Sequence, residues 1–274
     1  MDAGLDPWTS AVLGAVQGVT EFLPVSSSGH VALGALLFGE TELPLAMVVM
    51  LHVGTLVATM ALFWDDLLVL AGSVVTGLRT PRQWLDTDEG KTVAGVTLAT
   101  VPTVIVALIL KDQAESWARV PWALGVAFLA SSLAVASTRY GGGEVIVPTF
   151  LQAAVIGLAQ GLAVLPGLSR SGTTIACAMA LGLSGPAAFR FSFLMSFPVI
   201  IAAALYEVVK DPAAVTGLGA GAVIGGVVAM VVGYLALRWL RALVDQGRFW
   251  VFALYLIPLG LALLVWPSLF TGAP

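Results

Sequence analysis

Long apolar runs separated by short polar stretches dominate the sequence. Six of these runs approach the ~20 residues that a helix needs to cross the hydrocarbon core of a bilayer. Tryptophans close to the ends of several runs, such as Trp64 and Trp266, fit the aromatic belts found at membrane surfaces. We therefore predict membrane-spanning helices over Leu43–Trp64, Thr92–Leu110, Trp122–Ser137, Ala187–Tyr206, Ala213–Leu237 and Phe249–Trp266.

Two further apolar segments are short and interrupted by proline. Trp8–Leu23 stops at Pro24 and apolar sequence resumes over Val31–Phe38. In the same way, Phe150–Leu165 stops at Pro166 and resumes over Thr173–Leu183. Irregular backbone at membrane depth is tolerated only where it is buried in protein or lines a cavity. The pattern therefore predicts two re-entrant helix hairpins, with one kinked span for each segment as the alternative.

The two interrupted segments also look like copies of each other. Gln17–Gly29 and Gln160–Gly172 both begin with Gln-Gly, pass a proline and end in a serine cluster closed by glycine. Paired broken segments of this kind indicate an inverted-topology repeat with a site at the interface of its halves. We predict an all-α integral membrane protein, a single polytopic domain over residues 1–274. It would have about six transmembrane helices plus two re-entrant helix hairpins, with repeat 1 over about 1–137 and repeat 2 over about 145–274.

Composition agrees with this class and excludes others. The chain is 59% hydrophobic and 10% charged, with a mean hydropathy of +0.99, whereas soluble domains are about 25% charged. The sequence contains no basic patch, so it does not indicate a nucleic-acid partner. The single cysteine, Cys177, excludes a disulfide within the chain, and no Cys/His set has the spacing of a zinc site.

Basic residues are distributed unevenly if both hairpins are re-entrant. The loops on one side would then hold Arg79, Arg82, Lys91, Arg139, Arg190, Arg238, Arg241 and Arg248, and those on the other side Lys111, Arg119 and Lys210. By the positive-inside rule the first group is cytoplasmic. Both termini and the site between the hairpins are then predicted on the outer side of the cell membrane.

Few ionisable side chains remain at membrane depth, and such residues are functional candidates because burying a charge in lipid is costly. They are Glu21, His30, His52 and Arg170. Glu21 shares a helix face with Gln17, and it can pair with Arg170 if the hairpins meet. A purely structural Glu–Arg pair remains an alternative. His52 lies in an apolar span with no motif near it, and we interpret it as structural.

The serine clusters precede the second helix of each hairpin. Helix N-termini present unpaired N–H groups that suit phosphate, to which hydroxyl groups add further donors. The predicted phosphate-binding residues are Gln17, Ser26, Ser28, Ser169, Ser171, Thr173 and Thr174. Helix capping by the serines is expected as well and does not exclude ligand binding.

A carboxylate, an imidazole, hydroxyl groups and a guanidinium together predict phosphoryl transfer. The catalytic candidates are Glu21, Ser27, His30 and Arg170. His30 is a candidate nucleophile or general acid/base, and Ser27 is the rival nucleophile. Glu21 could instead hold Mg²⁺ or Ca²⁺, which would then depend largely on the phosphates of the substrate.

The same segments resemble the undecaprenyl-pyrophosphate phosphatase family, also called the bacitracin-resistance protein family. The resemblance rests on Gln17-x-x-x-Glu21, on the stretch Pro24–His30 with the sequence PVSSSGH, and on Pro166–Thr174 with the sequence PGLSRSGTT. Phe191–Leu194 also looks like family sequence. The number of hydrophobic segments and the length match throughout, so the resemblance covers essentially the whole chain.

The resemblance implies a divalent-metal-dependent membrane hydrolase of cell-wall biogenesis that converts undecaprenyl (polyprenyl) diphosphate to the monophosphate lipid carrier. The family's functional residues map onto Glu21, Ser27, His30, Ser169 and Arg170. Gln17 stands where other members carry a second carboxylate, which leaves Glu21 as the sole acid. A transporter or flippase of a polyprenyl phosphate lipid is the alternative function. The preferred isoprenoid length, the metal, the nucleophile and a homodimeric state stay open.

Overall fold

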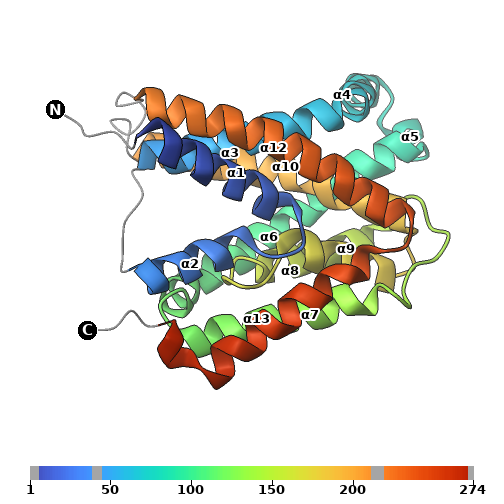
Figure 1. The fold of residues 1–274 in the computed structure, drawn as a ribbon. Coiled ribbons are helices and arrows are strands. Elements are labelled where there is room, and N and C mark those ends of the chain that lie inside the picture. The colour runs from blue at the N-terminus through green and yellow to red at the C-terminus, as the bar shows by residue number, and fades with distance from the viewer. Residues whose placement is uncertain (1–5, 39–44, 211–218, 271–274) are drawn as a thin grey trace.

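The computed structural model describes residues 6–38, 45–210 and 219–270, and this part of the chain is almost entirely helical (Figure 1). An isolated parallel bridge joins Val145 to Leu183. The predicted all-α class is confirmed. The helices in chain order are α1 Pro7–Phe22, α2 Ser27–Phe38, α3 Leu45–Leu62, α4 Trp64–Arg79, α5 Pro81–Trp84, α6 Asp88–Trp117, α7 Pro121–Ser137, α8 Phe150–Leu162, α9 Arg170–Ala180, α10 Gly185–Lys210, α12 Ala220–Asp245, η1 Phe249–Phe252, α13 Ala253–Val265 and η2 Pro267–Leu269.

Three of the described helices are long and apolar enough to cross a membrane by length and composition. They are α6, α10 and α12, and the bent pair α3–α4 adds a fourth if it counts as one broken span. The helices α7 and η1–α13, which we expected as full spans, are shorter apolar helices that pack against each other. The protein is therefore a multi-pass membrane protein, while the six-span inverted repeat and its two halves stay predictions.

The expected span over Leu43–Trp64 begins outside the described residues, and α3 covers it from Leu45 to Leu62. The chain bends by 79° where α3 meets α4, and α4 continues for 16 residues over a stretch that the apolar pattern left as a loop. Asp65 and Asp66 lie in the first turn of α4, where acidic side chains stabilise the positive end of the helix dipole. The predicted span Ala213–Leu237 begins outside the described residues, and α12 extends it to Asp245.

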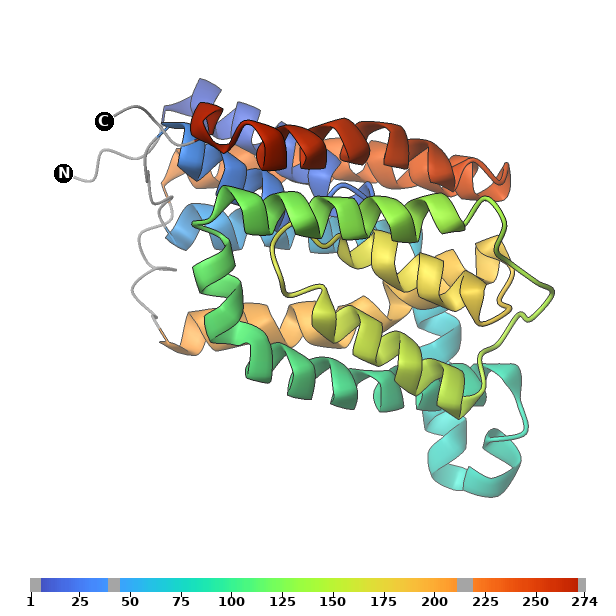
Figure 2. The same cartoon turned by 90° about the horizontal axis from the view of Figure 1, so that it is seen from below.

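Both interrupted segments fold as a helix, a break and a second helix. The first break separates α1 from α2 after Leu23, and the second separates α8 from α9 after Leu162. Each pair turns near the middle of the molecule, and the pairs extend toward opposite ends (Figures 1 and 2). This arrangement agrees with two re-entrant hairpins that enter from opposite sides.

Glycines allow each hairpin to pack closely against a long helix of the other half of the chain. Gly14 of α1 faces the backbone of α12, where an added Cβ would lie 2.3 Å from the carbonyl oxygen of Gly225. Gly157 of α8 faces α6, where an added Cβ would lie 2.3 Å from the carbonyl oxygen of Ala99. Gly14 and Gly157 precede Gln17 and Gln160 by the same number of residues. Small residues of this kind let membrane helices approach each other.

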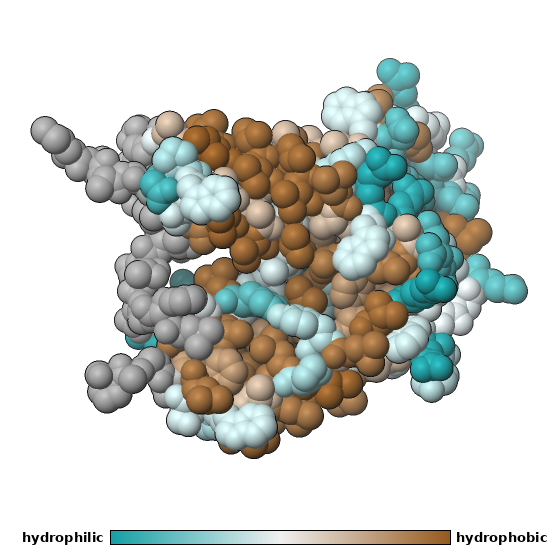
Figure 3. Space-filling model, in the orientation of Figure 1, coloured by the Kyte–Doolittle hydropathy of each residue, from teal (hydrophilic) through white to brown (hydrophobic). Residues whose placement is uncertain are grey.

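The surface agrees with a membrane environment. Apolar side chains cover the middle of the face shown in Figure 3, and hydrophilic side chains gather at the end that carries α4 and α5. Large hydrophobic residues on several helices are exposed, among them Leu108, Ile109, Leu133 and Leu254. Such an extensive exposed apolar surface is typical of contact with lipid.

The basic residues that the sequence assigned to one side gather at one end of the molecule. The C-terminal ends of α4 and α12, with Arg79 and Arg241, lie at that end together with α5 and Arg82 (Figure 1). The end of α6 and the start of α7, which flank Arg119, lie at the opposite end (Figure 2). The charge asymmetry is therefore a property of the fold, and its orientation in the membrane is a proposal developed below.

The close crossing of α3 and α12 at Gly54 generates a stability prediction. A Cβ at Gly54 would lie 2.1 Å from the carbonyl oxygen of Gly226, whereas nothing lies within 4 Å of a Cβ at Gly72. We expect Gly54→Ala to destabilise the fold by about 1–3 kcal/mol, as overpacking does. Gly72→Ala should be neutral or slightly stabilising, because alanine is the better helix former. Thermal unfolding in detergent measures both, and equal melting temperatures for the two variants would contradict the close crossing.

Candidate active site

The tips of the two hairpins are joined by hydrogen bonds around Ser26. This residue adopts a left-handed backbone conformation with φ of 68°, which is uncommon for a residue other than glycine. Its hydroxyl oxygen accepts the N–H of Gly29 at 3.2 Å, which caps α2, and the N–H of Gly167 in the other hairpin at 3.1 Å. Gly29 itself lies so close to Gly167 that an added Cβ would be 2.7 Å from the Gly167 nitrogen.

A second connection between the tips runs in the opposite direction. The hydroxyl of Ser171 donates to the carbonyl oxygen of Phe22 at 2.9 Å. Ser169 caps α9 by accepting the N–H of Gly172 at 3.0 Å, as Ser26 caps α2. Ser131 of α7 supports this loop, because its hydroxyl donates to the Gly167 carbonyl at 2.9 Å and accepts the Ser169 N–H at 2.7 Å. The tips therefore form one rigid hydrogen-bonded unit.

Glu21, in the last turn of α1, lies where the two tips meet. Its Oε1 accepts from Nη2 of Arg170 at 2.8 Å. Its Oε2 accepts the Ser27 hydroxyl at 2.8 Å and Nε2 of Gln17 at 3.2 Å. The side chains of Arg170 and Glu21 are 18% and 12% exposed, so the ion pair is largely shielded from solvent. Pairing and hydrogen bonds offset part of the cost of burying both charges.

The guanidinium of Arg170 has capacity for a further partner. Its carbon Cζ lies 5.7 Å from the ring centroid of Phe193, so one face of the cation packs against an aromatic ring. Nη1 is buried and has no hydrogen-bond partner among the described residues. Leaving a buried donor unpaired is costly, and Arg170 is also one of the residues that line the adjoining pocket. Arginine also binds phosphate oxygens in pairs.

A cluster of aromatic side chains packs next to this ion pair, and Phe193 of the cluster contacts Arg170. Phe22 of α1, Phe63 at the bend between α3 and α4, and Phe193 of α10 have ring centroids separated by 6.1 Å (Phe22–Phe193) and 5.9 Å (Phe63–Phe193). Next to this cluster, Nε of Arg190 in α10 donates to Oδ1 of Asp66 in α4 at 2.6 Å. The bent α3–α4 segment is thereby attached to α10, which fixes the two helices that form the remaining pocket walls.

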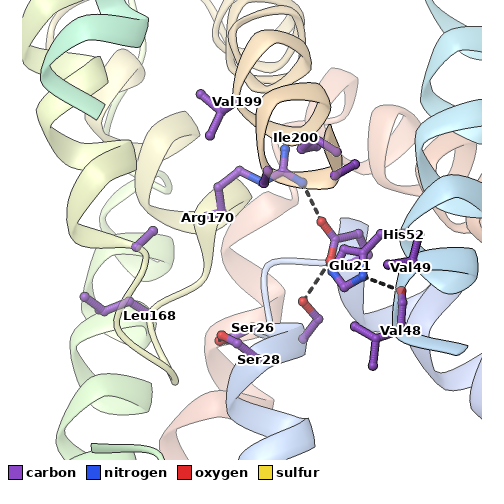
Figure 4. Close-up of a pocket in the computed structure, with 14 residues that line it drawn as sticks. Glu21, Ser26, Ser28, Val48, Val49, His52, Leu168, Arg170, Val199 and Ile200 are labelled. Atoms are coloured by element: carbon purple, nitrogen blue, oxygen red, sulfur yellow. Dashed lines mark hydrogen bonds and ion pairs between the residues drawn. The ribbon is translucent and has the colours of Figure 1, made fainter. Parts of the chain in front are cut away.

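A pocket of about 510 Å³ opens beside Glu21 and Arg170 (Figure 4). At its polar end it is lined by Glu21, Ser26, Ser27, Ser28, His52 and Arg170. The rest of its wall is apolar and comes from α3, from α10 and from the loop between α8 and α9. Those apolar lining residues are Val48, Val49, Ala163, Leu168, Val199, Ile200, Ala203 and Ala204. The pocket can therefore accept a molecule with a polar head and an apolar body.

Several predicted phosphate ligands lie behind the pocket wall instead of on it. Gln17 is buried and bonded to Glu21. Ser169 and Ser171 are buried and make the bonds between and within the tips described above. Thr174 donates to the Arg170 carbonyl at 2.8 Å and contacts the Ser192 hydroxyl, and Oγ1 of Thr173 is buried without a partner in the described chain. These positions support the residues that line the pocket.

The two histidines lie in unexpected places. His30, predicted near the reaction centre, is not among the pocket-lining residues and hydrogen-bonds Tyr255 of α13 at 2.7 Å. His52, which the sequence led us to interpret as structural, lines the pocket beside Glu21 (Figure 4). The apolar residues of α3 and α10 were also missed. Burial cost at membrane depth was the available signal for His52, but no neighbouring motif accompanied it.

The protein alone offers little to hold a divalent cation. Among the described residues, no group of three or more His, Cys, Asp or Glu side chains is arranged to bind a metal ion. Glu21 is the only carboxylate of the pocket, and both of its oxygens already accept hydrogen bonds. The donor set therefore fits a cation that is held mainly by a ligand's own phosphates, with at most one carboxylate from the protein.

Comparison of the sequence with known proteins identifies its family. A family model described as "Bacitracin resistance protein BacA" matches residues 10–262. A protein of Desulfosudis oleivorans named "Undecaprenyl-diphosphatase" is 40% identical over 264 residues, 93% of this chain and 97% of the relative. Two further relatives have the same name. The protein of Desulforudis audaxviator is 40% identical and covers 95% of this chain and 98% of the relative. The protein of Treponema denticola is 37% identical and covers 95% of this chain and 97% of the relative. The chain belongs to the bacitracin resistance protein BacA family.

Proposed function

We propose that the protein hydrolyses the terminal phosphate of undecaprenyl diphosphate, or of a related polyprenyl diphosphate, and so recycles the monophosphate lipid carrier for cell-wall or surface-glycan synthesis. The observation that carries the proposal is the position of Glu21, Ser27 and Arg170 at the polar end of a pocket whose other walls are apolar. The name shared by relatives along nearly their full length supports it.

The diphosphate head would bind at the polar end of the pocket. Arg170, which lines the pocket, would donate from its guanidinium to a phosphate oxygen. The hydroxyls of Ser26 and Ser28 lie 3.3 Å apart at the first turn of α2, where the helix N-terminus favours negative charge. Donors placed around the transferred phosphoryl group in a shielded site would supply much of the rate enhancement.

We propose Ser27 as the nucleophile. Its hydroxyl already donates to Glu21 at 2.8 Å, so Glu21 Oε2 can take the proton as Ser27 Oγ attacks the terminal phosphorus. The bond from that phosphorus to the bridging oxygen breaks, and its electron pair stays on the departing lipid monophosphate. Water then attacks the phosphoserine, phosphate leaves, and Ser27 recovers its proton.

A divalent cation, Mg²⁺ or Ca²⁺, forms part of the proposal as a companion of the diphosphate. When bound, it would neutralise charge on the phosphate oxygens. The chain's own contribution would be the carboxylate of Glu21, while Arg170 and the serine hydroxyls orient the phosphates.

The isoprenoid tail would leave the head along the apolar wall formed by α3 and α10 and continue into the lipid. By the positive-inside rule, we propose that the termini and the site lie on the outer side of the membrane, and the charge asymmetry supports this orientation. Membrane lipids surround the apolar surface, and a homodimer stays open as an assembly.

The alternative function is lipid transport, which would not require a bond to break. The hydrolase name of the relatives does not favour this alternative.

Three substitutions test the catalytic assignment. Glu21→Gln keeps the volume but cannot take a proton, Arg170→Lys loses the forked donor, and Ser27→Ala loses the nucleophile. We expect each to lower kcat for phosphate release from undecaprenyl diphosphate with Mg²⁺ or Ca²⁺ by at least about 100-fold, in the range typical of lost acid–base or electrostatic contributions.

Thermal unfolding of the same variants separates this outcome from a structural Glu–Arg pair. A structural pair predicts that activity follows the folded fraction, whereas the proposal predicts inactive protein that is still folded at the assay temperature. Wild-type protein that is folded but releases no phosphate with either metal would reject the hydrolase function and favour lipid transport.

The apolar wall generates a prediction about chain length. Ala203 lines the pocket, whereas its neighbour Ala202 is exposed outside it. Ala203→Trp should fill part of the tail path and raise KM for undecaprenyl diphosphate about tenfold, equal to about 1.4 kcal/mol, with little change for farnesyl diphosphate. Ala202→Trp is the matched control and should leave both values unchanged. Equal effects of the two substitutions would place the tail elsewhere.

A further inference from the structure

In both histidines of the chain, Nδ1 is hydrogen-bonded to the backbone carbonyl four residues earlier. The two side chains differ in the hydrogen-bond partner of the second ring nitrogen, Nε2. In His30, Nδ1 lies 2.8 Å from the carbonyl oxygen of Ser26. A carbonyl oxygen only accepts hydrogen bonds, so Nδ1 carries the proton and Nε2 of the neutral ring carries the lone pair. That lone pair accepts the hydroxyl of Tyr255 at 2.7 Å. Both nitrogens of His30 are therefore occupied.

In His52, Nδ1 lies 2.9 Å from the carbonyl oxygen of Val48. The same reasoning places the proton on Nδ1 and the lone pair on Nε2 of the neutral ring. No hydrogen-bond partner for this Nε2 is found in the part of the chain that the structure describes. His52 lines the pocket, whereas His30 does not. Of the two imidazoles, His52 is the one with a nitrogen available to a molecule in the pocket.

The fold holds His52 in this direction. Gly54, two residues further along α3, packs against Gly226 of α12. Successive helical residues are rotated by about 100°, so His52 faces away from α12 and toward the cavity. The charged groups that face it there are Glu21 of α1 and Arg170 of α9, and the wall residues contributed by α10 are apolar. Figure 4 shows the imidazole beside the Glu21 carboxylate, at the polar end of the pocket.

We infer that His52 is a catalytic residue that activates water for the second half of the reaction. In this step the water oxygen forms a bond to phosphorus of the phosphorylated Ser27, and His52 Nε2 accepts the proton that the water loses. The bond between phosphorus and Ser27 Oγ breaks, and Oγ regains the proton held by Glu21. Inorganic phosphate is the product, and His52 returns its proton to the departing phosphate, which restores the neutral ring. His30 instead holds α2 against α13 through Tyr255. The inference rests on the proposed function, which supplies the phosphoserine.

Two asparagine variants test the inference as a matched pair. Asparagine keeps an N–H donor near the position of Nδ1 and lacks any group at Nε2, so His52→Asn and His30→Asn preserve the local bond to the backbone. Undecaprenyl diphosphate is mixed rapidly with each folded variant, and lipid monophosphate and inorganic phosphate are quantified separately. We expect His52→Asn to release one equivalent of lipid monophosphate quickly, followed by turnover at least about 100-fold slower than wild type. His30→Asn should lower the melting temperature but keep the wild-type order of product release.

The outcomes are distinct. Wild-type turnover by His52→Asn overturns the inference, and so does slow turnover without the initial equivalent of lipid monophosphate, because the affected step would then precede phosphoserine hydrolysis. A wild-type protein that forms neither product rejects the proposed function instead.

Chemical rescue supplies a readout that a structural role would not affect. His52→Ala removes the imidazole and leaves space in the pocket, so added imidazole should restore a concentration-dependent part of the phosphate release. The same addition should not restore His30→Ala, whose ring lies outside the pocket. Absence of rescue in a folded His52→Ala protein would also contradict the assignment.

Discussion

The Glu21 carboxylate and the Arg170 guanidinium stabilise each other at the point where two broken helices meet. Either charge alone at membrane depth would cost several kcal/mol, and at 2.8 Å they offset part of that cost. Because Glu21 belongs to the first hairpin and Arg170 to the second, the pair forms only when both tips come together. The left-handed Ser26 and the close approach of Gly29 to Gly167 serve the same junction.

The two hairpin tips are similar in sequence but differ in their ionisable side chains. Ser27 follows Gln17 by as many residues as Arg170 follows Gln160, and these matched positions donate to opposite oxygens of one carboxylate. Glu21 itself corresponds to Val164, so the acid occurs in one half alone. Each tip carries a serine-capped half-helix, and in the proposed mechanism Ser27, Glu21 and Arg170 supply the nucleophile, the acid and the positive charge.

The sequence predicted the parts of this account that local patterns encode. Proline, glycine and serine clusters predicted both breaks, and the cost of buried charge predicted that Glu21 would meet Arg170. The amphipathic α4 was missed because its pattern lacks a continuous apolar run, and its polar first turn was interpreted as a loop. The positions of His30 and His52 depend on how α3 and α13 pack, as do the apolar walls, and no motif of the chain encodes that packing.

The central claim is that the head of the lipid is held between the tips of the two hairpins. A structure of the protein with a methylene-linked, non-hydrolysable analogue of a polyprenyl diphosphate tests it most directly. The account predicts the terminal phosphorus between Ser27 Oγ and the Arg170 guanidinium, with the tail along α3 and α10. A head group bound away from the Glu21–Arg170 pair, with that pair unchanged, would contradict it.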